Sequence, residues 1–220
     1  MLEAMYTPAA NRESSTPILW QFLRENPLCA LVTQTAQEMV ATHLPMVLEE
    51  DGSPFGILRG HIARANMQWQ QATLSAQALA VFTGPQHYIS ASWYPGKHVH
   101  GKEVPTWNYV AVHAYGRLRI VEDTDWLIRH LTALVDQSEV IVETPWRLSD
   151  APPEFIRKMA GAIVGVEMPI ERLEGKWKVS QNRSDEDAAA VMRGLDALQT
   201  PESATMKELI RSRRPDAKTD

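Results

Sequence analysis

Residues 87–109 read HYISASWYPGKHVHGKEVPTWNY, and no other window of the chain is as dense in aromatic and basic side chains. The prolines and glycines in this stretch disfavour a regular helix, so we expect a long irregular loop that presents its aromatic rings. Loops of this length within a compact domain are uncommon and are often functional. The flat rings and the lysine charges would suit a planar anionic ligand. The structural alternative is a loop that buries its rings over one end of a barrel.

Strand patterns lie on both sides of this loop. A further short strand is indicated from His87 to Ser90, and Asp51-Gly52 predicts a tight turn, so that residues 28–61 would form an antiparallel meander. Gly116 in the longest candidate strand indicates a bulge or a close backbone approach, and Pro169 indicates an edge or a break in another. The other strand candidates are residues 28–34, 39–49, 55–61, 78–83, 107–121 and 165–173. The pattern predicts a mainly β fold with α, a small antiparallel barrel with helices packed outside it.

Helix signals lie mostly near the N-terminus and in the second half of the chain. Thr16, Thr124 and Asp150 are the expected N-caps of three helices, and a fourth opens at Ser184 with acidic residues in its first turn. The helix candidates are residues 16–26, 66–74, 124–139 and 152–163, one from Ser184 and one after Thr200. We expect a single domain over residues 1–195, followed by a C-terminal helix and a mobile tail in residues 196–220.

Composition excludes several classes of protein. The chain has 220 residues and no apolar run long enough to cross a membrane, and no secretory signal is visible, so a cytoplasmic location is expected. The single Cys29 excludes an intramolecular disulfide and a cysteine-based metal cluster. A net charge of −5 disfavours a broad nucleic-acid footprint. The basic run Arg211–Arg214 follows a predicted helix, where cations also complement the helix dipole.

Three further clusters carry side chains that could bind a ligand. The first is Thr42-His43-Leu44-Pro45, although a histidine on a strand is more often a core or surface group. The second is residues 59–66, RGHIARAN, whose arginines could bind a phosphate or could lie in a solvated turn. The third is residues 174–183, EGKWKVSQNR, which suits a phosphate or the edge of an isoalloxazine ring and could reach a neighbouring subunit.

Other chemistries lack their motifs. The chain has no HExxH pattern, no GxSxG elbow, no Walker A loop, no GxGxxG fingerprint and no convincing helix-turn-helix signature. His98 and His100 could bind a metal weakly. No metal site and no catalytic residue are predicted.

The segments HLP (43–45), RGHIARAN (59–66), YISASWYPGK (88–97), HGKEVPTWNYVAVHAYG (100–116) and LEGKWKVSQNR (173–183) closely resemble the PaiB family. That family is described as FMN-binding negative transcriptional regulators related to the flavin-binding split barrels. The resemblance extends from Met5 to Gly194. Ala91 and Gly96 depart from the family, which more often has proline and serine there, and both are small enough to leave the loop intact.

The resemblance implies an FMN-binding split β-barrel that forms a homodimer, with one FMN per subunit at the dimer interface. It makes the turn from Arg59 to Asn66 a candidate for the phosphate, and the other segments candidates for the ring and the ribityl chain. The phosphate candidates are Arg59, Gly60, His61, Arg64 and Asn66. The other cofactor-binding candidates are Thr42, His43, Leu44, Pro45, Trp93, Tyr94, Lys97, Thr106, Trp107, Asn108, Tyr109, Lys176, Lys178, Gln181 and Arg183.

Three functions remain open at this point. The resemblance implies a regulator that acts on transcription, either on DNA directly or through a regulatory protein partner. The same barrel also hosts flavin oxidoreductases, so a redox enzyme with an indirect regulatory effect is the second possibility. The third is a protein that binds haem or another planar ligand, with His43, His61 or His113 as iron ligands.

Overall fold

The computed structural model describes residues 5–214, and their contacts divide them into two compact units. The core unit contains residues 15–82 and 112–173. The terminal unit contains residues 5–14, 83–111 and 174–214. The expected single domain over residues 1–195 stays a prediction, and the end of the expected mobile tail, residues 215–220, lies outside the described residues.

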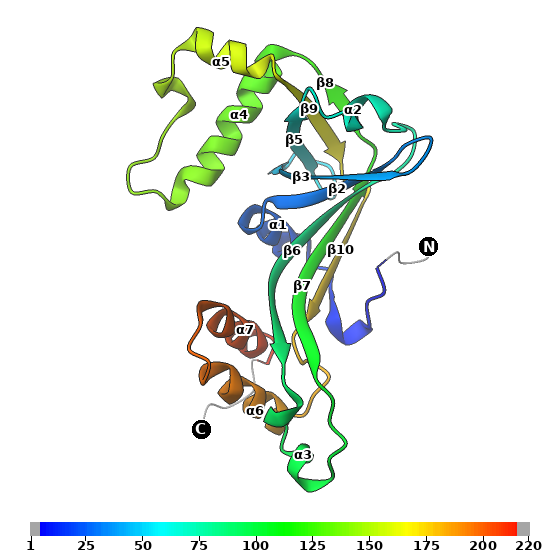
Figure 1. Cartoon of the computed structure of the whole chain (residues 1–220), viewed down its shortest axis with the longest axis vertical. Coiled ribbons are helices and arrows are strands. Elements are labelled where there is room, and N and C mark those ends of the chain that lie inside the picture. Colours follow the sequence, from blue (N-terminus) through cyan, green and yellow to red (C-terminus); the bar gives the residue numbers. More distant parts are fainter. Residues whose placement is uncertain (1–4, 215–220) are drawn as a thin grey trace. The chain divides into compact units, whose positions relative to one another are not determined.

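The first sheet of the core unit begins with an antiparallel hairpin of β2 (Leu28–Gln34) and β3 (Met39–Pro45) (Figure 1). In β2 the side chains of Cys29, Leu31 and Thr33 are buried, whereas the residues between them are partly exposed. This alternation is what a strand with one buried face requires. The other edge of β2 pairs antiparallel with β6 (Ala78–Ile89). The strand predicted at residues 28–34 is confirmed.

A second sheet of the core unit has four strands, and all of its neighbouring strands are antiparallel. Their order is β4 (Val47–Glu49), β5 (Ile57–Ala63), β9 (Ile163–Pro169) and β8 (Arg119–Val121). The two central strands bury Leu58, Ile62, Val164 and Met168. Burial of each such side chain contributes about 1.5–3 kcal/mol to folding, so the middle of this sheet is a main source of stability.

The predicted meander over residues 28–61 is wrong, because the chain changes sheet at Met46. Pro45 has no N–H to continue the ladder, and it ends β3. The backbone N–H of the fully buried Met46 instead donates to the carbonyl of Pro27 at 2.9 Å, an ordinary hydrogen-bond length. The predicted tight turn at Asp51-Gly52 is also wrong. The segment between β4 and β5 spans residues 50–56, and the Asp51 carboxylate accepts from the Ser53 N–H within it.

Three long strands have residues in both units. They are β6, β7 (Thr106–Gly116) and β10 (Arg172–Lys178), and they belong to a six-stranded sheet with the order β1-β10-β7-β6-β2-β3. β1 is the segment Arg12–Glu13, which pairs antiparallel with β10. The separate strands predicted at residues 78–83 and from His87 form one strand of 12 residues, since the fixed φ of Pro85 is compatible with extended backbone.

Gly116 ends β7 at a close backbone approach, as its place in the sequence predicts. A Cβ atom at this position would lie 2.1 Å from the carbonyl oxygen of Pro169. The backbone N–H of Glu171 donates to the carbonyl of Tyr115 beside it, at 2.8 Å. The strand predicted at residues 107–121 is therefore two strands, β7 and β8, with the buried Leu118 between them.

The stretch of residues 87–109 is more regular than the sequence predicts. β6 continues to Ile89 and β7 begins at Thr106, so both ends of the stretch are strand. Between them lie two single turns, the 3-10 helix η2 (Ala91–Trp93) and α3 (Gly96–Val99). Irregular backbone is limited to the residues around these turns, all of them in the terminal unit.

The helices lie close to their predicted positions, with corrected starts. α1 has Ser15 as its N-cap rather than Thr16, α4 has Asp123 rather than Thr124, and α5 has Pro152 rather than Asp150. In α6 the hydroxyl of Ser184 accepts from the Asp187 N–H, as predicted. The seven α-helices within the described residues are α1 (Thr16–Glu25), α2 (Gln68–Gln71), α3, α4 (Thr124–Ser138), α5 (Pro153–Ala160), α6 (Asp185–Asp196) and α7 (Pro201–Ser212).

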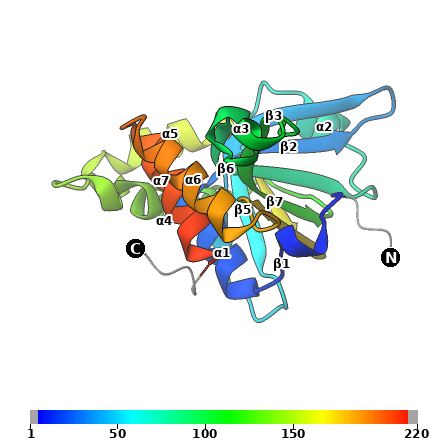
Figure 2. The same cartoon turned by 90° about the horizontal axis from the view of Figure 1, so that it is seen from below.

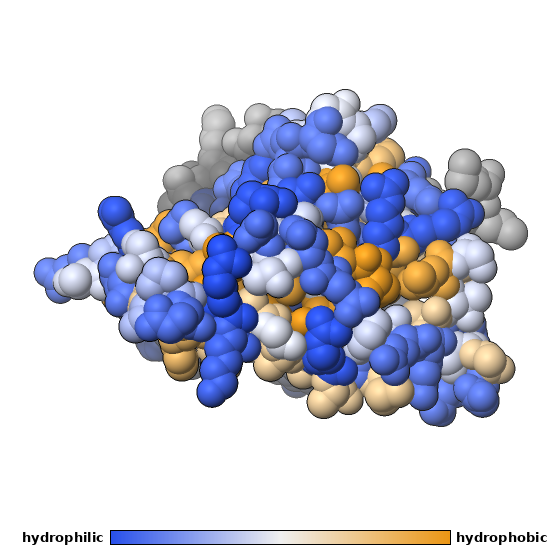
Figure 3. Space-filling model, turned by 90° about the horizontal axis from the view of Figure 1, so that it is seen from above, coloured by the Kyte–Doolittle hydropathy of each residue, from blue (hydrophilic) through white to orange (hydrophobic). Residues whose placement is uncertain are grey.

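In each unit the helices bury apolar side chains. In the core unit, α1 buries Leu19, Phe22 and Leu23 on one face. In the terminal unit, α6 and α7 pack against each other (Figures 1 and 2) and bury Leu195 and Met206 completely. Polar side chains surround an apolar area on the face seen in Figure 3. No helix within residues 5–214 combines the length and the apolar character that crossing a bilayer requires.

We predict that Gly116→Ala lowers the free energy of unfolding by about 1–3 kcal/mol, because the added methyl group overlaps a backbone carbonyl that cannot rotate away. Gly161→Ala is the matched control, since a Cβ there would lie 3.3 Å from its nearest neighbour and its φ is −64°. The control is expected to change stability by less than about 1 kcal/mol. Urea denaturation of both variants measures this, and equal effects would contradict the assignment of a close approach at Gly116.

Candidate functional site

The predicted binding residues divide between the two units, and each set forms its own contacts. In the core unit, Thr42 on β3 and Asn66 after β5 are brought together, because the Asn66 Nδ2 donates to the Thr42 hydroxyl at 2.8 Å. The Asn66 side-chain oxygen accepts from the Gln68 N–H at 3.0 Å, which fixes the amide. The Gln68 amide is itself buried and donates to the carbonyl of Leu31. Both predicted residues are therefore held on a rigid support, partly exposed.

Arg64 lies in the same segment of the core unit. Its Nε donates to the carbonyl of Gly161 at 3.1 Å, and its Nη1 forms an ion pair with Glu122 at 2.6 Å. The guanidinium also lies over the ring of Trp69, at 5.7 Å from the centroid. Both members of the ion pair are exposed, and such pairs contribute little, so an anionic ligand could compete with Glu122.

Arg59 is engaged in ion pairs within the protein, so it is less available to bind a phosphate than an unpaired arginine would be. It forms ion pairs with Glu49 and with Glu167, the second at 3.0 Å from Nε. Glu167 is mostly buried and has a second, longer contact of 3.5 Å with Arg119. The charge of Arg59 is thus compensated within the sheet. Gly60 beside it has a packing role, since a Cβ there would lie 2.8 Å from the Leu44 side chain.

His61 takes part in a histidine pair that sequence reasoning missed. Its Nδ1 lies 3.1 Å from the Nε2 of His130 on α4, and the ring of His130 stacks on Trp126 at 5.4 Å. Trp126 and His130 are four residues apart on a helix, which is the spacing that places two side chains on one face. The sequence shows that Trp126 and His130 share one face of a helix, but it does not show that this face packs against His61 on β5.

The histidine pair is held in its neutral form. Burial, followed by the neighbouring His61 and Arg59, lowers the pKa of His130 from 6.5 to about 4. Burial also lowers the pKa of His61. The Nδ1 of His130 is buried and has no hydrogen-bond partner within the described part of the chain. A cavity of about 340 Å³ beside the pair is lined by residues that include Arg59, Trp126 and His130.

In the terminal unit, β7 and β10 bring together cationic and aromatic side chains from the central stretch and from residues 174–183. The ammonium groups of Lys176 and Lys178 lie 5.4 and 6.0 Å from the centroid of the Tyr109 ring. Lys178 donates to the hydroxyl of Thr106 at 2.6 Å and to the carbonyl of Trp107 at 2.8 Å. We call Lys176, Lys178, Thr106, Trp107 and Tyr109 the lysine–aromatic face.

Two residues outside the predicted set border this face. Tyr6 is one: the Lys176 ammonium donates to its carbonyl at 2.8 Å and lies 5.6 Å from its ring. Tyr88 is the other, with its ring against that of Trp107 at 6.0 Å between centroids. The side chains of Tyr6 and Trp107 are 81% and 53% exposed, so aromatic surface is available to a ligand. The sequence signal for Tyr6 was only its place at the start of the family resemblance, which begins at Met5.

Other predicted residues of the terminal unit support its backbone. The buried Asn108 donates to the Ser180 hydroxyl at 2.9 Å, and Ser180 adopts a φ of 65°. That left-handed conformation is uncommon for a residue with a side chain, and the Asn108 bond helps to hold it. The Gln181 side chain bonds both to the Val179 N–H and to the Trp177 carbonyl, which closes the turn after β10.

Tyr94 and Arg183 form a buried cation–aromatic contact. The Arg183 guanidinium lies 4.2 Å from the Tyr94 ring centroid and pairs with Glu103 at 3.0 Å. Burial raises the pKa of Tyr94, whose ring is fully buried. Trp93 lies against Gly194, where a Cβ would be 2.4 Å from the indole. These aromatic side chains anchor the central stretch, which is the structural alternative that the sequence left open.

The remaining predicted residues are placed as follows. Lys97 is exposed on α3, His43 is exposed on β3, Leu44 is buried, and Pro45 ends β3. No group of three or more metal-ligating side chains lies close enough to hold a metal ion within residues 5–214. The chain thus offers two sets of ligand-binding chemistry. They are the hydroxyl–amide pair of Thr42 and Asn66, with Arg64 two residues earlier in the chain, and the lysine–aromatic face.

We predict that stability falls as the pH is lowered from about 6.5 to about 4, in part because of His130. Above pH 6.5 both states hold a neutral imidazole, whereas between 6.5 and 4 only the unfolded chain takes up the proton. The loss from this residue is roughly 3 kcal/mol in total. His130→Gln should flatten the dependence in urea denaturation across this range, and His98→Gln, exposed on α3, should leave it unchanged. An unaltered slope in His130→Gln would refute the assignment.

Comparison with known proteins agrees with these features. The family model described as "Putative FMN-binding domain" matches residues 5–172. The Bacillus subtilis protein named protease synthase and sporulation protein PAI 2 is 32% identical over 206 residues, which cover 94% of this chain and 96% of that protein. An uncharacterized protein of Emericella nidulans, AN0679, is 34% identical over 95% of this chain and 97% of its own length.

A solved structure shows the same fold at low identity. The FAD and haem binding protein from Mycobacterium smegmatis has a TM-score of 0.59 and 19% identity, with 82% of this chain and 80% of that chain covered. The antiparallel sheets with outer helices are accordingly those of a flavin-binding split barrel. Since the family model covers most of the chain and PAI 2 is similar along nearly its whole length, the chain belongs to the PaiB family of FMN-binding domain proteins.

Proposed function

We propose that this protein binds FMN, works as a homodimer and acts as a negative regulator of transcription. The FMN-binding family model supports the first part, and the third part is what the resemblance to the PaiB family implies. The name of the similar Bacillus subtilis protein PAI 2 refers to protease synthase and sporulation. The homodimer is carried over from the family resemblance.

The observation that carries the proposal is the lysine–aromatic face. FMN joins a flat aromatic ring system to an anionic phosphate, so its site needs stacking surface and positive charge together. Trp107 supplies an exposed indole, and Lys178 next to it has used two of its three N–H donors within the protein. The third donor and the charge of Lys178 remain for a phosphate. The residues of this face therefore fit the cofactor.

The segment from Arg64 to Asn66, with Thr42 bonded to Asn66, offers a second group of candidates for the phosphate. Arg64 contributes a guanidinium whose ion pair with Glu122 is exposed, and Thr42 and Asn66 contribute neutral hydrogen-bonding groups. Arg59 is a weaker candidate than the sequence indicated, because a phosphate would have to replace its pairs with Glu49 and Glu167. Variants at these residues and in the lysine–aromatic face distinguish between the two candidate positions for the phosphate.

We infer that the regulatory effect is exerted through a protein partner rather than through DNA phosphates. The densest basic run of the sequence is compensated by acidic partners. Arg211 pairs with Glu208, Arg213 with Glu13 at 2.7 Å, and Arg214 with Asp185. The net charge of −5 also disfavours binding along the phosphates of a duplex.

FMN, when bound, supplies redox chemistry, so a flavin oxidoreductase remains the second candidate function. An open cavity over the flavin beside Trp93 and Tyr94 would favour it, but Tyr94 is fully buried beneath Arg183. Haem is the third candidate. Of its predicted ligands, His61 is bonded to His130 and His113 lies 3.4 Å from the Tyr115 hydroxyl, so both imidazoles already have neighbours.

The first experiment is an absorbance spectrum of the purified protein after gel filtration, before and after addition of FMN and, separately, haem. A flavin spectrum that elutes at the size of a dimer supports the proposal. Bleaching of that flavin by a nicotinamide would favour the oxidoreductase. A Soret band without retained flavin would contradict FMN and favour haem as the cofactor.

We predict that Lys178→Met weakens FMN binding at least tenfold in a fluorescence titration, since it removes a charged hydrogen bond to phosphate. Trp107→Ala should weaken it as well, and because this indole is 53% exposed its loss should cost less stability than a core tryptophan. Lys97→Met, an exposed lysine on α3, is the matched control.

Arg64→Gln and Asn66→Ala test the second position in the same titration. Weakening by these two variants, with Lys178→Met unchanged, would move the phosphate to the core unit and overturn the assignment to the lysine–aromatic face. If Lys178→Met, Trp107→Ala, Arg64→Gln and Asn66→Ala all bind FMN with normal affinity, both candidate positions are wrong.

A further inference from the structure

A large cavity of the core unit is lined by none of the residues so far assigned to the cofactor. It has a volume of about 690 Å³ and lies between α4, α5 and the segment that joins them. Volumes of about 300–1,000 Å³ are usual for small-molecule sites. The lining residues are Ile128, Thr132, Asp136, Arg147, Leu148, Ser149, Ala151, Pro153, Ile156 and Arg157.

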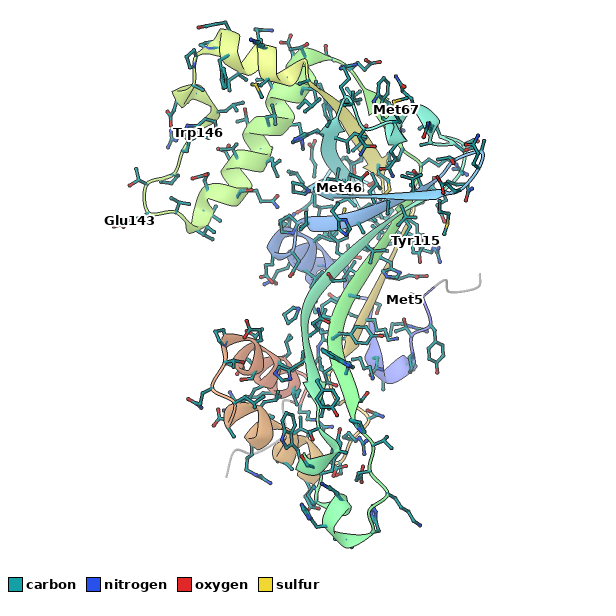
Figure 4. The ribbon with its side chains drawn as sticks, viewed as in Figure 1. Met5, Met46, Met67, Tyr115, Glu143 and Trp146 are labelled. Carbon is teal, nitrogen blue, oxygen red and sulfur yellow. The ribbon has the colours of Figure 1, made fainter. Side chains whose placement is uncertain are left out.

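The wall opposite α4 is a structured segment. After α4 the chain forms the 3-10 helices η3 (Glu139–Ile141) and η4 (Leu148–Asp150) and turns back to α5 (Figure 1). The Glu139 carboxylate accepts from the Trp146 N–H at 3.0 Å, and the Asp150 carboxylate accepts from the Arg147 N–H at 2.9 Å. These bonds close the segment on itself, and Figure 4 labels Glu143 and Trp146 along it. The cavity is therefore preformed.

Two opposite charges line the cavity without meeting. Arg147 and Asp136 form no ion pair with each other or with any residue from 5 to 214, so their charged atoms lie more than 4.0 Å apart. Arg157, the other arginine of the lining, has an exposed pair with Asp125 at 3.4 Å. An arginine and a carboxylate that share one cavity and lack protein partners can each bind one end of a ligand that carries both charges.

The rest of the lining is mostly apolar. Ile128 comes from α4, Leu148 from η4 and Ile156 from α5, and Ile156 is only 9% exposed. These side chains would remove an aliphatic group of a ligand from water, which is favourable by about 25 cal/mol for each Å² of apolar surface buried. The cavity thus combines an anion-binding group, a cation-binding group and an apolar wall.

We propose that this cavity binds a zwitterion with an apolar side chain, an α-amino acid or a short apolar peptide with free ends. The ligand carboxylate is held by Arg147, the ammonium group by Asp136, and the aliphatic side chain lies against Ile128, Leu148 and Ile156. This site does not depend on FMN, since it shares no residue with either candidate flavin position. It gives the regulator a second, independent input.

The test is isothermal titration calorimetry of the full chain with L-leucine and with L-leucyl-L-leucine. Binding of either supports the proposal, and the tighter of the two identifies the source as free amino acid or peptide. Acetylation of the ligand amine and amidation of its carboxylate should each weaken binding about tenfold or more, because each removes one charge-assisted contact.

Matched variants complete the test. In Asp136→Asn, acetylation of the ligand amine should no longer weaken binding, because the carboxylate that contacts the ammonium group is gone. In Arg147→Gln, amidation of the ligand carboxylate should likewise no longer weaken binding, because the guanidinium that contacts the carboxylate is gone. Lys158→Gln, on the same helix α5 but outside the lining, should bind normally. Circular dichroism confirms folding, which is expected because Asp136 and Arg147 are exposed.

Three results would overturn the proposal. They are the absence of heat with both ligands in folded protein, equal binding of the acetylated and free ligands, and equal binding by Arg147→Gln and Lys158→Gln. Because FMN titration of the same samples is a separate measurement, failure here is distinguishable from failure of the flavin proposal.

Discussion

The core unit depends on the change of sheet at Pro45 and Met46. Proline cannot donate to the ladder, and the next N–H is bonded to Pro27 instead, so one strand ends and another begins without a loop. Gly60 on the neighbouring strand makes this possible, since a Cβ there would lie 3.3 Å from the Pro45 carbonyl and closer still to Leu44. The crossing places β3 in one antiparallel sheet and β4 in the other, and the sheets then receive the remaining strands of the unit.

A second constraint is charge compensation. Several arginines that a sequence reader would assign to phosphate are paired with acids from distant parts of the chain, as Arg59 is with Glu167 and Arg213 with Glu13. Breaking a partly buried pair leaves a charge without its partner, which is costly, whereas exposed pairs can exchange. Not every arginine or lysine of the sequence is therefore available to bind an anionic ligand. Lys178 beside an exposed indole and Arg147 in the α4–α5 cavity are two that remain available.

Several residues that the sequence predicts at a ligand lie together in the structure, and others pack within the protein. Thr42 and Asn66 were both expected to bind and are in contact, and Trp107, Tyr109, Lys176 and Lys178 gather on one face. Tyr94 and Trp93 were expected at a ligand and instead pack against Arg183 and Gly194. An aromatic ring in a loop has the same local signal whether its face meets a ligand or the protein.

The sequence by itself determined the family, the strand at residues 28–34, the helix that opens at Ser184, and that Gly116 marks either a bulge or a close approach. Each of these depends on a local pattern, which is a family motif, a short apolar run, an N-cap or a glycine. Only the tertiary structure decided where the chain changes sheet, which acid neutralises Arg59, and that His61 meets His130. These contacts join residues that are far apart in the chain, and their free energy depends on burial and on distance in space, which local spacing does not encode.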